Sequence, residues 1–397
     1  MATRYRSVLS VPGSPRLLAT ALIGRLPQGM SSLAILLLVR GSTHSYAVAA
    51  LAVAVYTLAS AVCAPLQGHL IDRFGRARVL APSAIGQAAG LATLVLASDA
   101  HAGAPVLVGV AAVAGGLLPP VAPTVRALLG EVFRDASTRE SAYALDAVVQ
   151  EVIWTAGPLV VAVLIATVSA AAAVLLVAAI CVVGTLLFVF SPLARGGGSR
   201  GHRHTHQTAL ASRELRRLLL PVALTGAGLG AIEVGLPALA LHSGSRAASG
   251  LLLAIWSVGS MAGGLWYGSR TWRSPLAGRY RLLLVAAVVF SAPLIAARSV
   301  PVAMVCSLLA GLTIAPVFSC QYALVGRLVT AGAETEAFTW ISGALVTGIA
   351  AGTALGGVTV GPGGISAPFI VSCGATGLAA LFAAGAAERP LDVAPAS

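Results

Sequence analysis

Hydrophobic residues run in long blocks along this chain, and shorter polar stretches separate the blocks. A helix that crosses a membrane needs about 20 mostly apolar residues. Twelve blocks meet this requirement, and the turns at 168–170 and 298–301 are very short. The sequence therefore predicts an all-α integral membrane protein with twelve transmembrane helices, at 17–39, 46–67, 79–98, 105–130, 141–168, 170–190, 217–241, 248–268, 281–298, 301–326, 335–360 and 364–386.

Composition supports this prediction and excludes several classes of protein. Of the 397 residues, 57% are hydrophobic and only 10% are charged, and the mean hydropathy is +0.91. Soluble domains average about 25% charged residues. An ordinary cytosolic enzyme, a disordered chain and a secreted disulfide scaffold are therefore excluded. All 25 basic residues are Arg, so the chain has neither the Lys of a P-loop nor a Lys for Schiff-base chemistry.

The positions of the Arg residues predict how the chain lies in the membrane. Cytoplasmic loops of membrane proteins carry an excess of positive charge. With the N-terminus inside, 20 Arg fall in cytoplasmic segments and three, Arg40, Arg246 and Arg298, in external loops. We expect both termini in the cytoplasm, and we interpret the net charge of +12 as topology rather than as a nucleic-acid surface. Abundant Ala, Gly and Arg without Lys favour a bacterial plasma membrane.

Neither the cysteines nor any sequence motif indicates a disulfide, a metal site or a catalytic site. The five cysteines fall inside apolar segments, where we interpret them as packing residues rather than disulfides or metal ligands: Cys63, Cys181, Cys306, Cys320 and Cys373. No HExxH, CxxC pair, GxSxG or Gly-rich nucleotide loop occurs. We therefore predict no enzyme activity, no cofactor and no bound metal.

A polar gap at 191–216 divides the chain near its middle. It contains Gly196–Gly198, several Arg, and alternating His202, His204 and His206. This composition is typical of a solvated loop rather than a metal site, although a role for the His tract stays open. We predict an N-terminal six-helix half at 1–190, a flexible cytoplasmic linker at 191–216 and a C-terminal six-helix half at 217–397.

An internal repeat supports this division. Adding 196 to positions in the fourth helix leads to matching residues in the tenth. The pairs are Gly115 and Gly311, Pro120 and Pro316, Val121 and Val317, Ala127 and Ala323, Leu128 and Leu324, and Gly130 and Gly326. Repeated halves of this kind are common in secondary transporters.

The loop after the second helix reads Gly68-His-Leu-Ile-Asp-Arg-Phe-Gly-Arg-Ala-Arg-Val-Leu80. It resembles the signature of the major facilitator superfamily, G-x-L-x-D-R-x-G-R-[RK]-x-x-L. Ala77 departs from the pattern where a second basic residue is common, and Arg78 follows one position later. The loop lies between the second and third of twelve helices, where the family has it. The resemblance implies two six-helix bundles related by a pseudo-twofold axis.

The signature loop also predicts a conformational latch, made of Gly68, Asp72, Arg73, Gly75, Arg76 and Glu131. The resemblance implies that Asp72 faces the N-terminus of the eleventh helix, near Glu334–Phe338. Arg73 can pair with Glu131 at the inner end of the fourth helix. The alternative is that these Arg residues only enforce topology. The second half has Gly263–Arg270 at the corresponding place but no Asp, so the latch would be asymmetric.

Five charged residues lie well away from the ends of predicted helices, where an unpaired charge costs about 2.5–3.5 kcal/mol. Arg126 and Asp146 are equally far from the turn between helices four and five, and we interpret them as a structural ion pair. Arg25, Glu151 and Glu233 lie about 12, 15 and 23 Å from the inner face. The resemblance implies that helices one and seven line a central cavity from opposite halves and that helix five lies beside helix one. It therefore implies an Arg25–Glu151 pair and Glu233 across the cavity.

These three residues are our candidates for substrate binding or proton coupling. Glu233 has no basic neighbour in its own helix and is the first candidate for carrying a proton or a cationic group. Arg25 is the candidate for an anionic or polar group. Structural alternatives are a salt bridge for Glu151 and a hydrogen-bonded, protonated acid for Glu233. Further cavity candidates, each also compatible with packing or lipid contact, are Gln28, Gln150, Trp154, Gln321, Tyr322 and Trp340, together with Tyr56 and Trp256.

The resemblance implies a secondary active transporter that works by alternating access on a small organic solute. We expect proton-coupled efflux by antiport. Gly157-Pro158 in the fifth helix matches part of the G-P-x-x-G-G motif of proton-driven exporters, although Val160 and Val161 replace its glycines. Alternatives are an uptake symporter or facilitator for a metabolite, or a membrane sensor or intramembrane enzyme without transport. The expected partners are the lipid bilayer, the solute and protons, with no nucleic acid, and the chain is expected to act as a monomer.

Overall fold

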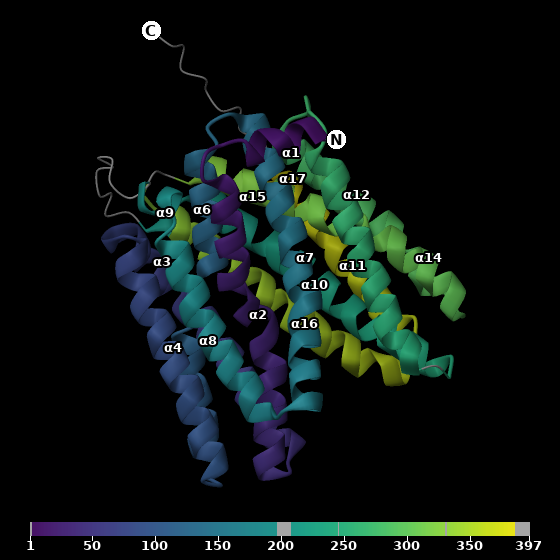
Figure 1. The fold of residues 1–397 in the computed structure, drawn as a ribbon. Coiled ribbons are helices and arrows are strands. Elements are labelled where there is room, and N and C mark those ends of the chain that lie inside the picture. Colours follow the sequence, from purple (N-terminus) through teal and green to yellow (C-terminus); the bar gives the residue numbers. More distant parts are fainter. Residues whose placement is uncertain (1, 197–207, 245, 330–331, 386–397) are drawn as a thin grey trace.

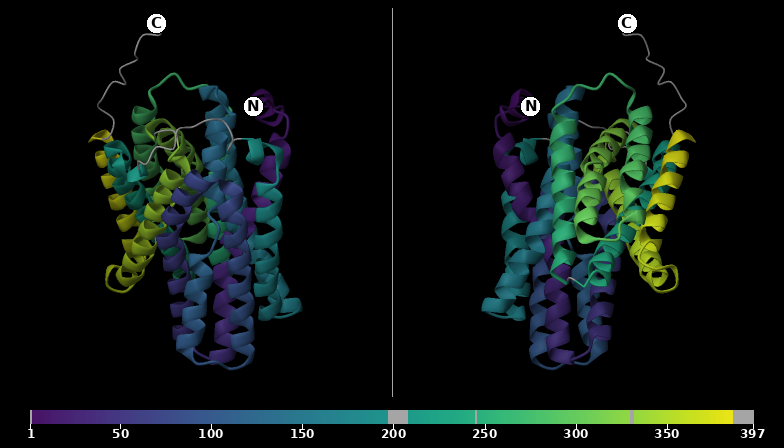
Figure 2. Two further views of the ribbon diagram at one scale, coloured as in Figure 1. Left: turned by 90° about the vertical axis from the view of Figure 1, so that its left-hand side faces the viewer. Right: turned by 90° about the vertical axis from the view of Figure 1, so that its right-hand side faces the viewer.

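The computed structural model shows two sets of membrane-length helices that run alongside each other (Figures 1 and 2). It describes residues 2–196, 208–244, 246–329 and 332–385. The N-terminal half contains α1 (Ala2–Leu9), α2 (Ser14–Thr43), α3 (Tyr46–Phe74), α4 (Arg76–Asp99), α5 (Ala104–Gly116), α6 (Val121–Val132), α7 (Ala136–Thr167) and α8 (Ala170–Val189).

Two short elements, α9 (Pro192–Gly196) and η1 (Ala209–Ala211), follow the first half. The C-terminal half contains α10 (Arg213–His242), α11 (Arg246–Gly268), α12 (Leu276–Ser291), α13 (Pro293–Ala296), α14 (Val300–Gly311), α15 (Ile314–Leu328), α16 (Glu334–Gly363) and α17 (Ala367–Gly385). Eleven segments are long and apolar enough to cross a membrane, and α17 supplies the twelfth, with Ala367–Ala383 as its apolar part. The predicted twelve-helix fold is confirmed.

Three predicted spans are broken into two helices each. The spans at 105–130, 281–298 and 301–326 correspond to α5–α6, α12–α13 and α14–α15. Proline explains these breaks, because it has no N–H to donate to the carbonyl four residues earlier. Pro120 precedes α6, Pro293 begins α13, and Pro316 lies one turn after the break at Leu312.

The linker is shorter than the sequence predicted. Residues 192–196 and 213–216 were assigned to it, but they are helical. α10 begins early because the Ser212 hydroxyl accepts the backbone N–H of Leu215 at 3.1 Å, which caps the helix. The His202, His204 and His206 tract lies outside the described residues.

Side chains cap other helices in the same way. Ser45 and Ser169 accept backbone N–H groups at the starts of α3 and α8. Asp135 accepts the N–H of Thr138 at 2.8 Å at the start of α7. Hydrogen bonds from Ser137 and Thr138 lower the pKa of Asp135 to about 2, so this cap is charged at neutral pH.

The 196-residue repeat has a structural counterpart in two close helix contacts. A Cβ atom at Gly115 would lie 2.1 Å from the carbonyl oxygen of Tyr56, and one at Gly311 would lie 2.1 Å from that of Trp256. Each glycine therefore lets a broken helix pack directly on a neighbouring backbone, α5 on α3 and α14 on α11.

The outer faces of the helices are apolar and exposed. On α3, for example, Leu58, Val62 and Leu66 are each more than half exposed. Their spacing of four residues places them on one side of the helix. Large exposed apolar surfaces of this kind fit contact with lipid, in agreement with a multi-pass membrane protein.

The two halves meet at one end of the bundle, which we call the terminal end because α1 and the end of α17 lie there (Figure 1). The contacts between the halves join α3 to α16, α7 to α11 and α15, and α6 to α16. By contrast, α2 and α10, the first membrane-spanning helices of the two halves, scarcely touch. The halves are thus closed together at the terminal end.

Replacing Gly115 by Ala should destabilise the protein, because the new methyl group cannot fit against the Tyr56 carbonyl. Overpacking of this kind costs about 1–3 kcal/mol. We expect a lower Tm in detergent for Gly115→Ala. Gly109→Ala in the same helix is the matched control, since nothing lies within 4 Å of its Cβ position. Equal Tm values for the two variants would contradict the close contact.

Candidate functional site

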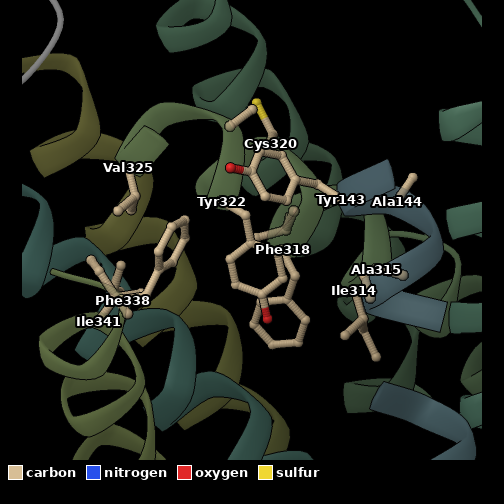
Figure 3. Packing of buried hydrophobic residues seen from close by; sticks show 14 of the residues in the cluster. Tyr143, Ala144, Ile314, Ala315, Phe318, Cys320, Tyr322, Val325, Phe338 and Ile341 are labelled. Atoms are coloured by element: carbon tan, nitrogen blue, oxygen red, sulfur yellow. The ribbon is translucent and has the colours of Figure 1, made fainter. Parts of the chain in front are cut away.

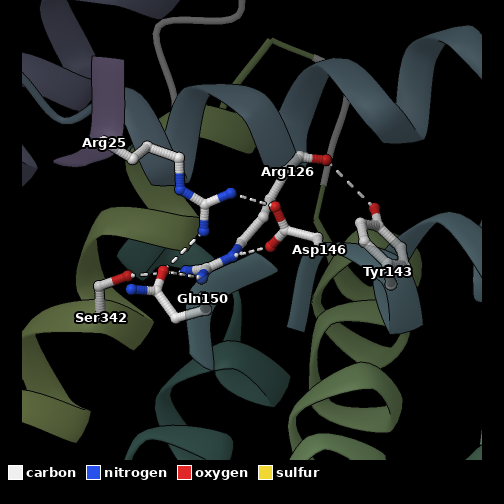
Figure 4. Close-up of polar contacts among 6 residues, drawn as sticks. All are labelled: Arg25, Arg126, Tyr143, Asp146, Gln150 and Ser342. Atoms are coloured by element: carbon white, nitrogen blue, oxygen red, sulfur yellow. Dashed lines mark hydrogen bonds and ion pairs between the residues drawn. The ribbon is translucent and has the colours of Figure 1, made fainter. Parts of the chain in front are cut away.

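A buried cluster of charges lies where α2, α6 and α7 meet (Figure 4). The Nε of Arg126 donates to Asp146 Oδ2 at 2.9 Å, and Arg25 pairs with the other oxygen of the same carboxylate. Both guanidinium groups also donate to Gln150 Oε1, at 2.6 Å from Arg25 and 3.3 Å from Arg126. All four side chains are at most 7% exposed. The predicted Arg126–Asp146 contact is confirmed.

Arg126 also contacts the C-terminal half. Its guanidinium carbon lies 4.0 Å from the centre of the Tyr322 ring, and its Nη1 donates to the Ser342 hydroxyl at 3.4 Å. Tyr322 lies 196 residues after Arg126, and Ser342 lies 196 residues after Asp146. The cluster therefore lies on the pseudo-twofold axis, with charged residues on one side and their uncharged repeat equivalents on the other.

The predicted Arg25–Glu151 pair is wrong. Five residues separate Asp146 from Glu151, which turns the side chain by about 140° around the helix. Asp146 consequently faces α2 and Arg25. Glu151 faces α11 instead, where its Oε1 accepts a hydrogen bond from Ser260 at 2.9 Å. Glu151 therefore connects the two halves rather than neutralising Arg25.

Glu233 lies on α10, and its side chain is exposed. None of the ion pairs among the described residues includes it. Glu151 of α7 is likewise absent from these ion pairs. Each half therefore contributes one carboxylate, Glu151 or Glu233, that has no basic partner in the described parts of the chain.

Several predicted cavity residues lie close to this region. Gln150 belongs to the charged cluster, and Tyr322 stacks on Arg126. Trp154 follows Tyr143, Ala147 and Gln150 at spacings of four, three and four residues, which places it on the same face of α7. It is 49% exposed, so this face is open beyond the cluster.

Other cavity candidates lie elsewhere. The Trp340 indole donates to Glu336 Oε1 at 3.4 Å, so it belongs to the latch region rather than to a cavity. Gln28 is half-buried outside the cluster. Tyr56 is buried in the N-terminal half and accepts a hydrogen bond from Gln87 at 2.8 Å. Trp256 lines a small cavity within the C-terminal half, and Gln321 is fully buried with no partner for its amide.

Aromatic side chains fill the space between the halves on the terminal side of the cluster (Figure 3). Tyr143 of α7 packs against Tyr322 and Phe338 of the C-terminal half, with ring centres 6.2 Å apart in both pairs. The Tyr143 hydroxyl also faces two glycines related by the repeat, since Cβ atoms at Gly130 and Gly326 would lie 3.1 and 2.9 Å from it. Tyr143 therefore closes the contact between the halves close to the axis.

The predicted contact of Asp72 with the N-terminus of the eleventh spanning helix is present. Asp72 accepts the backbone N–H groups of Thr335 and Glu336 at 3.2 and 2.9 Å, at the positive N-terminus of α16. Gly68 permits this approach, because a Cβ there would lie 2.8 Å from the Cα of Glu336. Gly75 has φ of 91°, a left-handed conformation that separates α3 from α4.

The predicted Arg73–Glu131 pair is wrong. Arg76, at the start of α4, pairs with Glu131 and also donates to the Ala194 carbonyl at 3.4 Å. Arg73 ends α3 on the other side of the Gly75 turn, and its guanidinium lies over the Phe74 ring at 5.1 Å. The two arginines diverge because the turn at Gly75 places them on different helices.

Three ionic contacts between the halves were not predicted. His69 Nδ1 lies 3.0 Å from Glu336 Oε2. Glu140 forms ion pairs with Arg279 Nη2 at 2.9 Å and with Arg327 Nη2 at 3.9 Å. Glu140 and Glu336 are 196 residues apart, so both repeats place an acid at the same position. Extending the repeat to helices five and eleven would have identified this pair. The second half therefore contributes its own ionic contact despite lacking the latch Asp.

No group of three or more His, Cys, Asp or Glu side chains in the described parts of the chain is arranged to hold a metal ion. The site is instead built for charge: two guanidinium groups and a carboxylate at the axis, with two further carboxylates near them. Such groups can bind ionic solutes and exchange protons within the low-dielectric interior of a membrane protein.

Comparison with known proteins identifies the class. The family model for the Major Facilitator Superfamily matches residues 17–269. The chain belongs to this superfamily, whose members are transporters. A search of curated protein sequences found no match.

Solved structures share the fold over nearly the whole chain. The human organic anion transporter MFSD10 (TETRAN) matches with a TM-score of 0.72 and 19% identity, covering 94% of this chain and 99% of that one. A bacterial homologue of the iron transporter ferroportin, in an outward-facing state, gives 0.75 and 16%, with the same coverage. The E. coli fucose:proton symporter FucP gives 0.70 and 11%, covering 96% and 100%.

Replacing Gly68 by Val should shift the protein toward a state with an open terminal end, because the side chain collides with the α16 backbone. In a Cys-less background, spin labels at exposed positions 78 and 273 report the separation of the halves at this end. We expect longer distances for Gly68→Val than for the parent. Gly343→Ala is the control, since its Cβ would lie 3.8 Å from the Ala61 carbonyl and fits. An unchanged distance distribution would show that Gly68 does not limit closure.

Proposed function

We propose that this transporter exports a small organic solute in exchange for protons, by alternating access. The observation that carries the proposal is the exposed carboxylate of Glu233 on α10, which takes part in none of the ion pairs of the described residues. In this mechanism Glu233 binds either a proton or a cationic group of the solute, but not both. Such competition is the physical basis of antiport, because each ligand displaces the other.

We further propose that the terminal end faces the cytoplasm of a bacterial plasma membrane. The Arg-rich loops of the sequence support this orientation. The structure then corresponds to an outward-facing state, with Asp72, Glu336 and Glu140 holding the cytoplasmic side closed. Separation of these contacts would open the site toward the cytoplasm while the opposite ends of α2 and α10 come together.

The test is proton-coupled flux in proteoliposomes. A pH gradient is imposed, a panel of cationic, zwitterionic, anionic and neutral organic solutes is supplied, and lumenal pH and solute are followed together. Wild type should move solute and protons in opposite directions. Glu233→Gln removes the titratable group, so we expect its solute-dependent proton movement to fall to background. Asp99→Asn, at an exposed acid at the end of α4, is the control and should retain coupling.

Three results would count against the proposal. Movement of solute and protons in the same direction would indicate a symporter. Solute flux without proton movement would indicate a facilitator. Coupling that persists in Glu233→Gln but is lost in Glu151→Gln would move the proton site to α7.

A further inference from the structure

The charged cluster at the axis carries an excess of positive charge. Arg25 and Arg126 share a single acid, Asp146, and their remaining acceptor in the cluster is the neutral amide of Gln150. With all three ionised, the cluster has a net charge of +1. A buried structural ion pair normally has matched charges, because an unmatched charge inside a membrane is costly. The unmatched positive charge of this cluster therefore calls for a functional explanation.

The C-terminal half does not supply the missing negative charge. The groups that face Arg126 from that half are the Tyr322 ring and the Ser342 hydroxyl, both uncharged. Position 342 is the repeat equivalent of Asp146, so an acid there would have been placed to complete the pairing. Glu151, a further acid on α7, is hydrogen-bonded instead to Ser260 on α11.

The cluster also has unused hydrogen-bonding groups. Both side chains are at least nine-tenths buried. Within them, the Nε of Arg25 and the Nε2 of Gln150 have no hydrogen-bond partner. Both atoms are donors. A buried donor without an acceptor is destabilising, so an anionic ligand would satisfy the hydrogen-bonding groups as well as the charge.

The groups that cover Arg126 belong to the C-terminal half. Tyr322 and Ser342 are on α15 and α16, so separation of the halves at the terminal end would break both contacts. The proposed alternating access requires this separation, which would expose the +1 charge on the N-terminal half. A ligand bound there would take the place of the Tyr322 ring and the Ser342 hydroxyl.

We propose that Arg126 and Arg25 bind the anionic group of the transported solute, and that this solute is a small zwitterion of the amino-acid type. The inference rests on the proposed function, in which Glu233 binds the cationic group. Arg25 and Arg126 both donate to Gln150 of α7. The next residue, Glu151, is hydrogen-bonded to Ser260 of the C-terminal half, and Glu233 lies on α10 of that half. A carboxylate at the arginines and an amine at Glu233 would therefore place the two ends of the solute on opposite halves.

The test compares transport of substrates that differ in charge, first by the wild type and then by variants in which the charge of the cluster is changed. The probes are the neutral amino acids, their amides, which are cations, and their N-acetyl derivatives, which are anions. In wild type, a zwitterion should be transported at least about tenfold better than its amide, which is the effect of one charge-assisted hydrogen bond. Gln150→Glu places a carboxylate within reach of both arginines and reduces the net charge to zero.

Gln150→Glu should lose the preference for the zwitterion and transport the amide equally well or better. Its Tm should be unchanged or higher, because the new carboxylate accepts the same hydrogen bonds from Arg25 and Arg126. Ser274→Glu, which adds the same charge at an exposed position in the loop before α12, is the control and should keep the preference. A cluster that only stabilises the fold predicts no change of selectivity in either variant.

A second variant tests the same charge from the other half. Ser342→Asp places an acid at the repeat equivalent of Asp146, next to Arg126, and should also abolish the preference for the zwitterion. This variant decides the outcome if Gln150→Glu does not fold. Retention of the preference in a folded Gln150→Glu or Ser342→Asp protein would overturn the inference.

The inference and the proposed function can fail separately. Proton-coupled transport of amides as efficient as that of amino acids in wild type would overturn the zwitterion site and leave proton exchange at Glu233 intact. Transport of amino acids without proton movement would support the site and overturn the coupling. No transport of any amino acid, while other solutes exchange with protons, would also overturn the inference.

Discussion

The guanidinium group of Arg126 connects the buried charged cluster of the N-terminal half to the surface of the C-terminal half. Placing a charge in the centre of a membrane costs about 2.5–3.5 kcal/mol, so the group requires compensation. Asp146 provides it within the N-terminal half, and this requirement fixes α6 against α7. The remaining face of Arg126 lies against Tyr322 and Ser342 of the C-terminal half. One side chain therefore joins the interior of one bundle to the surface of the other.

The internal repeat gives both halves the same backbone and different chemistry. Pro120 and Pro316 follow breaks in equivalent helices, and Gly115 and Gly311 allow equivalent close contacts. At the axis, however, Arg126 and Asp146 correspond to Tyr322 and Ser342. Symmetry of the backbone provides two bundles that can rock against each other. The side chains differ between the halves and place the charges of this cluster in the N-terminal half. The two sides of the site are therefore chemically different.

Closure of the terminal end depends on contacts that can form and break. Asp72 accepts backbone N–H groups at a helix N-terminus, Glu336 pairs with His69, and Glu140 pairs with Arg279 and Arg327. These interactions are individually modest, as ionic contacts near a surface usually are. The aromatic packing around Tyr143 adds apolar contact without permanent bonding. An interface of this kind can hold one state closed and still release it.

The sequence by itself determined the number of spanning helices, the family and the contact of Asp72 with α16. These features follow from apolar length, Arg distribution, a repeat and a local motif, all of which are local in the chain or periodic along it. Only the tertiary structure decided which charges pair. Depth along a helix can be counted from the sequence, and it brought Arg126 and Asp146 together correctly. Rotation about the helix axis and the choice of facing helix cannot be counted in this way. Arg25 therefore pairs with Asp146 and not with Glu151, which lies five residues further along the same helix. Likewise, Glu131 pairs with Arg76 and not with Arg73, because the turn at Gly75 lies between the two arginines.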